Sequence, residues 1–512
     1  MSAAHVAEAL ARAAEAAGQE LAVVDGPRRV DYATLQRLAA GAAAAMQAQG
    51  LEPGDRVLLH LEQSLEAVVG LYGCWLAGGV AVPASAVLRA RQVAYLAEHA
   101  EAAQLWTVPR LAARLDPATT TALPAQDMGA LVQERLAAPS ATDASRGTPS
   151  SPDDPAAILY TSGSTGPPKG IVLSHGNLIA GARIVSGYLR LRSDDRILAL
   201  VPFSFDYGLN QLLDAVQVRA TLVVQRSALP ADVCRTLERQ RITVLAGVPP
   251  FWVQLMEGRS PFPQRAFPDL RLITSTGGLF PQALADRYRE QLPHLEVVRM
   301  YGLTEAFRST WLPAAELDAH PDSIGRAIPE CEVLVLDEDG RPCAPGTAGE
   351  LVHRGPTVSW GYWRDAEASA RVFRPDPDPE QAHRDAAGRP RPVVHSGDLV
   401  VADEAGYLRF VARMDETIKT LGYRVSPTEV EELAVASGVV LEAVAGGVPD
   451  PTLGAAIHLH VVPRHPGDFH PDDLRAWFRE QAPRYLWPAE VQVHAAFPRT
   501  AHGKIDRTAI LA

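Results

Sequence analysis

A run of hydroxyl-bearing residues and glycines that ends in a lysine carries the clearest chemistry in this chain. It reads YTSGSTGPPKG over residues 160–170 and follows an apolar segment that predicts a strand. Glycine lets a ligand approach the backbone closely, hydroxyl groups donate hydrogen bonds, and an ammonium group offsets negative charge. The segment therefore predicts a loop that binds nucleotide phosphates, with these candidate ligands: Thr161, Ser162, Gly163, Ser164, Thr165, Gly166 and Lys169.

This loop differs from a Walker loop. In a Walker loop the lysine directly follows the second glycine, and a helix begins there. Here Pro167 and Pro168 separate the glycine from Lys169, and the β-branched run IVL follows Gly170. These features predict a second strand after the loop and a different way of holding phosphate.

The surrounding segments indicate how the loop is positioned. Between Asp55 and Tyr301, short runs rich in Val, Ile and Leu alternate with helical patterns. That alternation is typical of strand-helix units around largely parallel sheets. After Glu330, the segments EVLVLDEDGRP and GELVHRG predict a smaller antiparallel unit. Beyond Asp415, strand and helix patterns predict a compact C-terminal unit, whereas the polar, proline-rich stretches 138–155 and 374–392 predict exposed connections.

Composition excludes several classes of function. Lys and Arg total 48 of 512 residues against 60 Asp and Glu, a formal charge of -12, so the surface offers no broad basic face for nucleic acid. No apolar run approaches the ~18–20 residues that span a bilayer, and the N-terminus lacks the pattern of a signal peptide. The cysteines are scattered, without metal-binding spacing: Cys74, Cys234, Cys331 and Cys343. We expect a cytoplasmic protein with reduced thiols and no membrane association.

Several segments, in order along nearly the whole chain, resemble the adenylate-forming superfamily, which includes acyl-CoA synthetases, carrier-protein adenylation domains and luciferases. They are YTSGSTGPPKG, STGG at 275–278, MYGLTE at 300–305, GELVHRGPTVSWGYW at 349–363, HSGDLV at 395–400, ARMDETIKTLGYRVSPTEVE at 412–431 and PRTAHGKIDR at 498–507. The resemblance implies an α/β protein. Its large N-terminal domain, residues 1–414, would hold stacked, mostly parallel sheets with helices plus a small antiparallel sub-barrel. Its C-terminal domain, residues 415–512, would be small, mobile and α+β.

The resemblance also implies an activity. Enzymes of this superfamily convert a carboxylate and ATP into an acyl adenylate and pyrophosphate, and a thiol then displaces AMP. By resemblance, Glu305 holds Mg²⁺ on the ATP phosphates. The other nucleotide-binding positions that match are Thr304 at the α-phosphate, Tyr301, Gly277 and Gly278 at the adenine, Gly302 beside Tyr301 in the same motif, and Asp398 with Arg413 at the ribose. Thr161 of the phosphate loop and Thr304 are counted with Glu305 and Lys504 as catalytic candidates.

Lys504 resembles the family lysine that bridges the substrate carboxylate and the α-phosphate during adenylation. Because this lysine would hinder access of the thiol, the C-terminal unit is expected to rotate between the two half-reactions. Asp415 matches the hinge position, and Gly422 would line the thiol channel. Arg424 would approach phosphate in one of the two states.

The acyl pocket is expected around Asp206, Ser275, Met300, Arg308 and Ser309. The sequence Phe-Asp at 205–206 resembles a pair in amino-acid-activating domains, whose aspartate holds the substrate ammonium. An arginine nearby suits a second carboxylate, so the residues suggest a small amino acid, such as an amino dicarboxylic acid. Two alternatives stay open: Asp206 caps a helix or pairs internally, or Asp206 and Arg308 neutralise one another and leave a pocket for a plain acyl group.

The thiol is expected to come from a separate molecule, because no carrier attachment loop follows Lys504. The leading hypothesis is transfer to a freestanding acyl or peptidyl carrier protein through its phosphopantetheine. The alternative is an acyl-CoA ligase that transfers a simple carboxylic acid to coenzyme A. Two further alternatives are a luciferase-type oxidative enzyme and a non-catalytic nucleotide-binding paralogue. The last is disfavoured because Lys504, Glu305 and the phosphate loop are all present.

Overall fold

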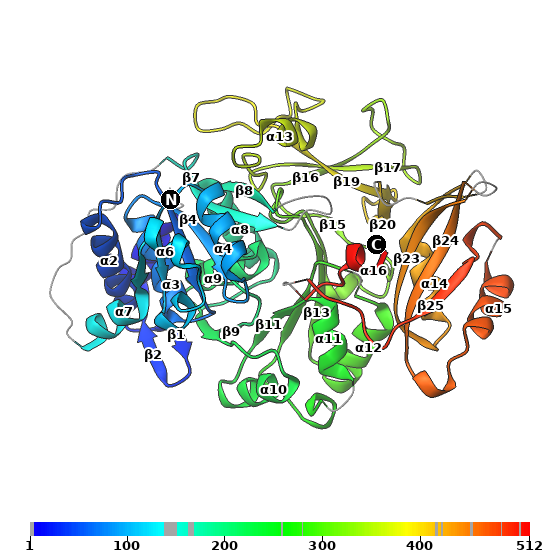
Figure 1. The fold of residues 1–512 in the computed structure, drawn as a ribbon, viewed down its shortest axis with the longest axis horizontal. Helices are drawn as coiled ribbons and strands as arrows, with labels where there is room; N and C mark the ends of the chain where they lie inside the picture. Colours follow the sequence, from blue (N-terminus) through cyan, green and yellow to red (C-terminus); the bar gives the residue numbers. More distant parts are fainter. Residues whose placement is uncertain are drawn as a thin grey trace. The chain divides into compact units, whose positions relative to one another are not determined.

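The computed structural model describes residues 5–137, 151–161, 168–257, 260–278, 280–414, 418–420, 423–450, 454–482, 484–500 and 503–511 (Figure 1). Packing divides the chain into two compact units. The first holds residues 1–333 and 353–394, and the second holds residues 334–352 and 395–512. This division groups residues 395–414 with the C-terminal part of the chain, so the functional boundary expected at 414/415 stays a prediction.

The first unit contains a nine-stranded sheet. Six neighbouring strands, in the order β13-β12-β11-β9-β10-β1, run parallel. At the two edges the pairs β13-β14, β14-β15 and β1-β2 are antiparallel. The strands are β1 (Leu21–Asp25), β2 (Arg28–Asp31), β9 (Arg196–Ala199), β10 (Thr221–Val224), β11 (Val244–Gly247), β12 (Leu272–Ser275), β13 (Glu296–Tyr301), β14 (Thr310–Leu312) and β15 (Arg326–Ala327).

A second, six-stranded sheet has the order β6-β5-β3-β4-β7-β8, in which only β8 is antiparallel to its neighbour. Its strands are β3 (Arg56–Leu61), β4 (Val80–Ser85), β5 (Ala102–Thr107), β6 (Ala125–Asp127), β7 (Pro155–Thr161) and β8 (Lys169–Ser174). The expected stacked, mostly parallel sheets are therefore confirmed.

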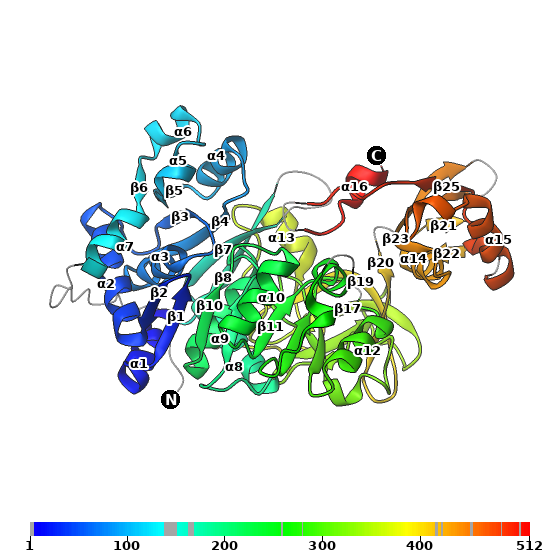
Figure 2. The same ribbon diagram turned by 90° about the horizontal axis from the view of Figure 1, so that it is seen from below.

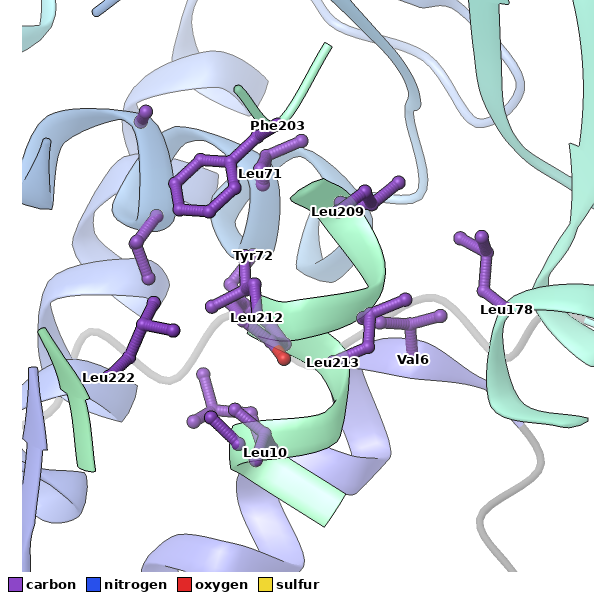
Figure 3. Close-up of a cluster of buried hydrophobic side chains, with 14 of the residues drawn as sticks. Val6, Leu10, Leu71, Tyr72, Leu178, Phe203, Leu209, Leu212, Leu213 and Leu222 are labelled. Atoms are coloured by element: carbon purple, nitrogen blue, oxygen red, sulfur yellow. The ribbon is translucent and has the colours of Figure 1, made fainter. Parts of the chain in front are cut away.

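Helices accompany the strands of the first unit. They are α1 (Val6–Ala17), α2 (Tyr32–Ala48), α3 (Leu65–Leu76), α4 (Ala90–His99), α5 (Pro109–Ala112), α6 (Pro117–Ala122), α7 (Met128–Ala137), α8 (His175–Tyr188), α9 (Asp206–Val218), α10 (Pro230–Arg239), α11 (Pro249–Met256), α12 (Gln282–Gln291) and α13 (Ala366–Val372). Figure 3 shows Leu209, Leu212 and Leu213 of α9 among side chains of α1, α3 and α8. Burial of these leucines holds α9 in place, and with it the helix start at Asp206.

Local signals set the ends of α9. Phe205 precedes the helix in an extended conformation, and the acidic Asp206 occupies the first turn, where the helix dipole favours a negative charge. The helix ends at Arg219, which has a left-handed φ of 62°.

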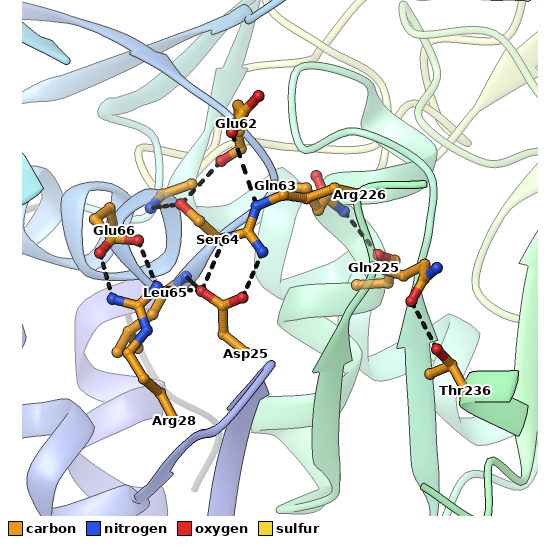
Figure 4. Close-up of polar contacts among 12 residues, drawn as sticks. Asp25, Arg28, Glu62, Gln63, Ser64, Leu65, Glu66, Gln225, Arg226 and Thr236 are labelled. Atoms are coloured by element: carbon orange, nitrogen blue, oxygen red, sulfur yellow. Dashed lines mark hydrogen bonds and ion pairs between the residues drawn. The ribbon is translucent and has the colours of Figure 1, made fainter. Parts of the chain in front are cut away.

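A polar network links the end of β1 to the start of α3 (Figure 4). The carboxylate of Asp25 accepts hydrogen bonds from Nη1 of Arg226, at 2.7 Å, and from the backbone N–H of Leu65, at 3.1 Å. Arg28 contacts both Asp25 and Glu66. Burial would raise the pKa of Asp25, but the bonds from Arg226 and Leu65 and the charge of Arg28 lower it below its ordinary value. The network therefore holds a carboxylate in its ionised form.

An antiparallel sheet follows, as expected after Glu330. Its order is β16-β17-β19-β18, and β20 also pairs with β19. The strands are β16 (Glu332–Leu336), β17 (Ala348–Arg354), β18 (Phe373–Arg374), β19 (Val393–Ala402) and β20 (Leu408–Arg413).

The segment 374–392 is mostly exposed, as predicted, but the expectation is wrong for three of its residues, because Asp376, Ala382 and Arg391 are buried. Asp376 is buried in an ion pair of 2.5 Å with Arg354. Arg391 is also buried, with its guanidinium 4.1 Å from the ring of Trp360. The composition of the segment could not reveal these two contacts, because their partners lie elsewhere in the sequence.

The C-terminal part of the second unit is α+β. It contains the hairpin of β21 (Ile418–Thr420) and β22 (Tyr423–Val425) and a sheet of β23 (Val440–Asp450), β24 (Gly454–Pro463) and β25 (Glu490–Val493). Its helices are α14 (Pro427–Ala436), α15 (Pro471–Gln481) and α16 (Arg507–Leu511). Figure 2 shows α14 and α15 beside this sheet, and their apolar side chains share its core. The Ser426 side chain caps α14 by accepting a hydrogen bond from Glu429 N–H.

The four cysteines are free thiols. Cys74 and Cys234 are buried, and Cys331 and Cys343 are partly buried. Within the described ranges, no helix combines the length and the apolar character needed to cross a membrane.

Candidate active site

The carboxyl ends of parallel strands collect the candidate residues of the first unit. Because β9, β11, β12 and β13 run parallel, their carboxyl ends lie at one edge of the sheet. Ser275 ends β12 and Tyr301 ends β13, while Asp206 follows β9 and opens α9. Ligands of open α/β sheets bind at such edges.

The predicted phosphate loop joins β7 to β8. These strands form a hairpin in which Thr161 lies opposite Lys169. The residues between them that were predicted to bind phosphate lie outside the described residues: Ser162, Gly163, Ser164, Thr165 and Gly166. The second strand predicted after Lys169 is present, so the loop leads into β8 rather than a helix.

Tyr362 connects the end of this hairpin to Glu305. Nζ of Lys169 lies 5.0 Å from the centroid of the Tyr362 ring, and the Tyr362 hydroxyl donates a hydrogen bond of 2.7 Å to Oε1 of Glu305. Backbone bonds hold the Tyr362 segment against β8, including a bond of 2.7 Å from Trp363 N–H to the Gly170 carbonyl. Mg²⁺ on a polyphosphate is usually held by one or two carboxylates together with phosphate oxygens and waters, and Glu305 supplies such a carboxylate. The donor set at Glu305 therefore fits the implied metal.

Tyr362 was not assigned a role from the sequence. The signal was present, because the motif that carries the resemblance includes GYW at residues 361–363. An aromatic residue there gave no indication of which carboxylate its hydroxyl would reach.

A tight turn between β13 and β14 brings further candidates together. Its start favours a glycine, because a Cβ at Gly302 would make a tight contact of 3.2 Å with Cα of Arg308. Phe307 adopts a left-handed φ of 59°, and Ser309 N–H bonds back to the Tyr301 carbonyl at 3.2 Å. The turn thereby presents Thr304, Glu305 and Arg308 from one loop.

Asp206 and Arg308 form an ion pair. Nη1 of Arg308 lies 2.5 Å from Oδ2 of Asp206, and the side chains of Arg308 and Asp206 are 1% and 13% exposed, respectively. Thr304 Oγ1 lies 3.4 Å from the other carboxylate oxygen of Asp206, and the Arg308 guanidinium lies 4.9 Å from the ring of Tyr207. Burial would lower the pKa of Arg308, but the Asp206 carboxylate raises it above its ordinary value. The sequence left open whether Asp206 and Arg308 neutralise one another, and in the structure they form this ion pair.

The other predicted pocket residues lie in or beside two neighbouring strands, β12 and β13. Ser275 and Ser309 are buried, and among the residues that the structure describes neither hydroxyl group has a hydrogen-bond partner. Met300 is also buried, and its Sδ accepts a hydrogen bond of 3.0 Å from the hydroxyl of Tyr188. Gly277 follows β12 with φ of 80°, a conformation that favours glycine.

Tyr301 has an aromatic neighbour that the sequence did not indicate. Its ring is stacked with the imidazole of His353, with centroids 6.1 Å apart and planes inclined by 20°. An adenine that packs on Tyr301 would therefore meet a ring already supported by a second ring.

The second unit brings Asp398 and Arg413 together, as the resemblance implied. The two residues are directly opposite in β19 and β20, and Nη1 of Arg413 lies 2.9 Å from Oδ1 of Asp398. Arg413 also donates to the Ser396 carbonyl at 3.1 Å, while the Ser396 hydroxyl donates to the Leu351 carbonyl at 2.6 Å. Neighbouring strands thus fix a carboxylate that could accept both hydroxyl groups of a ribose.

Lys504 is exposed, and backbone bonds join its neighbours in the sequence. The Thr500 N–H donates to the Lys504 carbonyl at 2.8 Å, and Nη1 of Arg499 donates to the Gly503 carbonyl at 3.2 Å. Arg499 is also ion-paired with Glu442 of β23. The loop that carries the predicted catalytic cation is therefore attached to the C-terminal sheet.

Three predictions for the second unit are untested. Asp415 and Gly422, expected at the hinge and the thiol channel, lie outside the described residues. Arg424 belongs to β22, where its backbone pairs with Lys419, but its side chain is not among the described ones.

Comparisons with known proteins cover most of the chain. Residues 10–363 match the family model described as AMP-binding enzyme, and residues 429–504 match that of the AMP-binding enzyme C-terminal domain. A feruloyl-CoA synthase of Amycolatopsis sp is 32% identical over 494 residues, which cover 94% of each chain. A linear gramicidin synthase from Brevibacillus parabrevis is 28% identical over 94% of this chain, which spans 9% of that protein.

Solved structures show the same fold. ATP-bound MatB from Rhodopseudomonas palustris is 26% identical, with a TM-score of 0.86 and coverage of 100% of this chain and 98% of that chain. The o-succinylbenzoate coenzyme A synthetase MenE from Bacillus subtilis, solved with ATP and a magnesium ion, has a TM-score of 0.84 at 24% identity. The match covers 98% of this chain and 99% of that chain.

Proposed function

Since this chain belongs to the family of AMP-binding enzymes, we propose that it activates a carboxylic acid with an uncharged acyl group and transfers that group to coenzyme A. The chain is an AMP-forming acid-thiol ligase that uses ATP and Mg²⁺. Its first reaction joins the acid to AMP and releases pyrophosphate, and its second forms a thioester and releases AMP. We propose the class of the acid and the identity of the thiol acceptor.

The ion pair of Asp206 and Arg308 carries the proposal for the acid. An amino acid would place its ammonium against a carboxylate that already has a cation at 2.5 Å. A second carboxylate on the substrate would compete with Asp206 for Arg308 in the same way. Breaking a buried pair leaves an uncompensated charge and costs about 3–5 kcal/mol, whereas a neutral acyl group leaves the pair intact.

Relatives of similar length support coenzyme A as the acceptor. The feruloyl-CoA synthase matches this chain over 94% of both proteins, so the comparison involves no additional domain. An indoleacetate-CoA ligase of Aromatoleum aromaticum is 29% identical over 94% of this chain and 92% of its own. Use of ATP and coenzyme A also supports a cytoplasmic location, which we include in the proposal.

The residues would act in the following order. The hairpin end with Thr161 and Lys169 would bind the ATP phosphates, and Glu305 would hold the Mg²⁺ that offsets their charge. The acid would then approach the α-phosphate beside Thr304, where positioning and charge neutralisation supply most of the rate enhancement. No protein nucleophile takes part.

The second unit would supply the remaining contacts. Asp398 and Arg413 would bind the ribose, and Lys504 would bridge the acid and the α-phosphate. After adenylation, residues 415–512 would rotate about Asp415, so that Lys504 leaves and the thiol enters past Gly422. This movement would let one site perform two reactions in turn.

Transfer of an amino acid to a carrier protein is the second candidate. It is favoured by the Phe-Asp sequence at 205–206 and by the similarity to a gramicidin synthase. In that case the substrate ammonium would have to share Asp206 with Arg308.

A panel assay separates the two candidates. Purified protein, ATP and Mg²⁺ would be incubated with single acids and amino acids, and pyrophosphate release measured with hydroxylamine as a trap. Active acids would then be offered coenzyme A or a carrier protein bearing phosphopantetheine. We expect neutral acids to be activated and coenzyme A to be acylated; activation of amino acids alone, with transfer only to the carrier, would contradict the proposal.

A further inference from the structure

A small cavity lies beside Arg308, on the side of the nine-stranded sheet covered by α8 and α9. Its volume is about 20 Å³, which is room for about one water-sized group. Polar residues among its walls come from α9, from β12 and from the turn between β13 and β14: Tyr207, Asn210, Gln211, Asp214, Thr274 and Arg308. Asn210 and Asp214 lie on the same side of α9 as Asp206, the first residue of the helix, because the three residues are spaced by four.

The polar atoms around this cavity are incompletely bonded. Oδ1 of Asn210, Oε1 of Gln211, Oδ1 of Asp214, and Nε and Nη2 of Arg308 have no hydrogen-bond partner among the described residues. All four side chains are more than nine-tenths buried. A buried polar atom without a partner costs about 1–3 kcal/mol, so five such atoms around one cavity indicate a site for a polar group.

The charges around the cavity select a neutral group. The guanidinium of Arg308 is already balanced by Asp206. Burial raises the pKa of Asp214 well above its ordinary value, an effect opposed by Arg308 and by the bond from Asn210, so the protonated, neutral carboxyl is favoured. A substrate carboxylate or ammonium would therefore add an unbalanced charge, whereas a neutral oxygen could accept from Arg308 and, as a hydroxyl, donate to Asn210.

Contacts place the cavity at the far end of the proposed acyl site. Thr304, beside which the acid would meet the α-phosphate, contacts Asp206, and Asp206 contacts Arg308. Arg308 in turn lines the cavity. An acid bound by its carboxylate near Thr304 would thus direct its other end toward Arg308 and Asp214.

We propose that the cavity receives a neutral oxygen, a hydroxyl or carbonyl group, at the distal end of the substrate acid, and that Asn210, Asp214 and Arg308 select for it. This inference rests on the proposed function, because it assumes that the ligase activates a neutral acid. It narrows the substrate class to acids with an uncharged oxygen function away from the reacting carboxylate.

Matched probes test the inference. Three series, built on butanoate, hexanoate and benzoate, would each contain the parent acid and its distal hydroxyl, carboxyl and amino derivatives. The readout is kcat/KM for acid-dependent exchange of labelled pyrophosphate into ATP. We expect the hydroxyl derivative of at least one series to exceed its parent by about 10-fold or more, because a site built to hydrogen-bond a hydroxyl group rejects an analogue that lacks it.

Variants of α9 then identify the selecting residues. Asn210→Leu and Asp214→Leu should abolish the preference, so that the ratio of kcat/KM for the hydroxyl derivative to kcat/KM for its parent acid falls to about 1. Asp214→Asn should retain it, since a neutral amide replaces a neutral carboxyl. Gln217→Leu, an exposed change in the same helix, is the matched control and should behave like the parent protein. Circular dichroism would confirm that each variant is folded.

Each result has one meaning. Preference for the parent acids would overturn the inference while leaving the proposed function intact. Preference for the carboxyl or amino derivatives would overturn the proposed function, which assumes an uncharged acyl group, and the inference with it. An unchanged preference in folded Asn210→Leu and Asp214→Leu would also overturn it. Pyrophosphate exchange with amino acids but with none of the probes would instead overturn the proposed function, and the inference with it.

Discussion

The hydroxyl group of Tyr362 donates a hydrogen bond of 2.7 Å to Oε1 of Glu305, although the two residues are 57 positions apart in the sequence. The centroid of the Tyr362 ring lies 5.0 Å from Nζ of Lys169. One aromatic side chain therefore contacts both the end of the phosphate-loop hairpin and the carboxylate proposed to hold Mg²⁺. This arrangement makes Tyr362 a positioning residue for both.

Replacing Tyr362 by Phe should weaken the use of Mg²⁺. The variant keeps the ring beside Lys169 but loses a hydrogen bond to a charged group, worth about 1.5–3 kcal/mol. Adenylation at limiting Mg²⁺ should fall about 10–100-fold, and added Mg²⁺ should restore part of the loss. The measurement is pyrophosphate exchange across a magnesium titration.

Tyr32→Phe is the control for this change. The Tyr32 hydroxyl bonds to the carbonyls of Ala215 and Ala220, in a buried position with no catalytic role in this account. This control should lose stability without changing its magnesium dependence. An identical magnesium response for Tyr362→Phe and the parent protein would show that the bond does not position the metal ligand.

Asp206 and Arg308 should be strongly coupled in stability. Asp206→Leu leaves a buried guanidinium without its carboxylate, and Arg308→Leu leaves the carboxylate without its cation. Each should lower the free energy of unfolding by about 3–5 kcal/mol, while the double variant should be more stable than either single variant. Urea unfolding of the four proteins measures the coupling, and additive losses would contradict a direct pair.

Asp214 should make stability fall as pH rises. Burial raises the pKa of its folded-state carboxyl above the ordinary 3.8, although Arg308 and Asn210 oppose the shift. Below pH 3.8 the carboxyl is protonated in both the folded and the unfolded chain, and its contribution to the free energy of unfolding is complete. Above that pH the unfolded chain releases the proton first, so stability declines by up to about 1.4 kcal/mol per pH unit until the folded pKa is passed.

The difference between the parent protein and Asp214→Asn isolates this effect. The amide does not titrate, so the parent should lose stability relative to the variant as pH is raised above 3.8 in urea unfolding experiments. A difference that stays constant over this range would mean that Asp214 has the same pKa in the folded and unfolded chains.

Local patterns predicted much of the fold. The alternation of apolar runs and helical segments was sufficient for β3 and α3, and for the parallel strands that end at Ser275 and Tyr301. Resemblance to a family paired Asp398 with Arg413 correctly, although the strand register that joins them is a tertiary property.

The acyl site was less predictable, because its chemistry depends on which charges meet. The sequence left open whether Asp206 and Arg308 bind substrate groups or each other, and 102 positions separate them. Asn210 and Asp214 were missed because polar residues in a helix ordinarily face solvent. Their positions four and eight residues after Asp206, on one side of a mostly apolar helix, were the signal that could have identified a buried polar side.

Arg499 should position the loop of Lys504. Its guanidinium bonds to the Gly503 carbonyl and pairs with Glu442. Arg499→Ala should slow adenylation with little change in KM for the acid, and Arg499→Lys should recover part of the rate. Glu442→Gln is the matched control, because it keeps the bond from Arg499 to Gly503. Equal rates for Arg499→Ala and the parent protein would show that the loop needs no such anchor.

Lys504→Ala most directly tests the central claim, which is that a single cation on the C-terminal unit serves the adenylation step alone. The two half-reactions would be measured separately, as pyrophosphate exchange with a preferred acid and as thioester formation from a synthetic acyl adenylate and coenzyme A. The account predicts that exchange falls about 10²–10³-fold or more, while thioester formation keeps the parent rate. Exchange at the parent rate would contradict it.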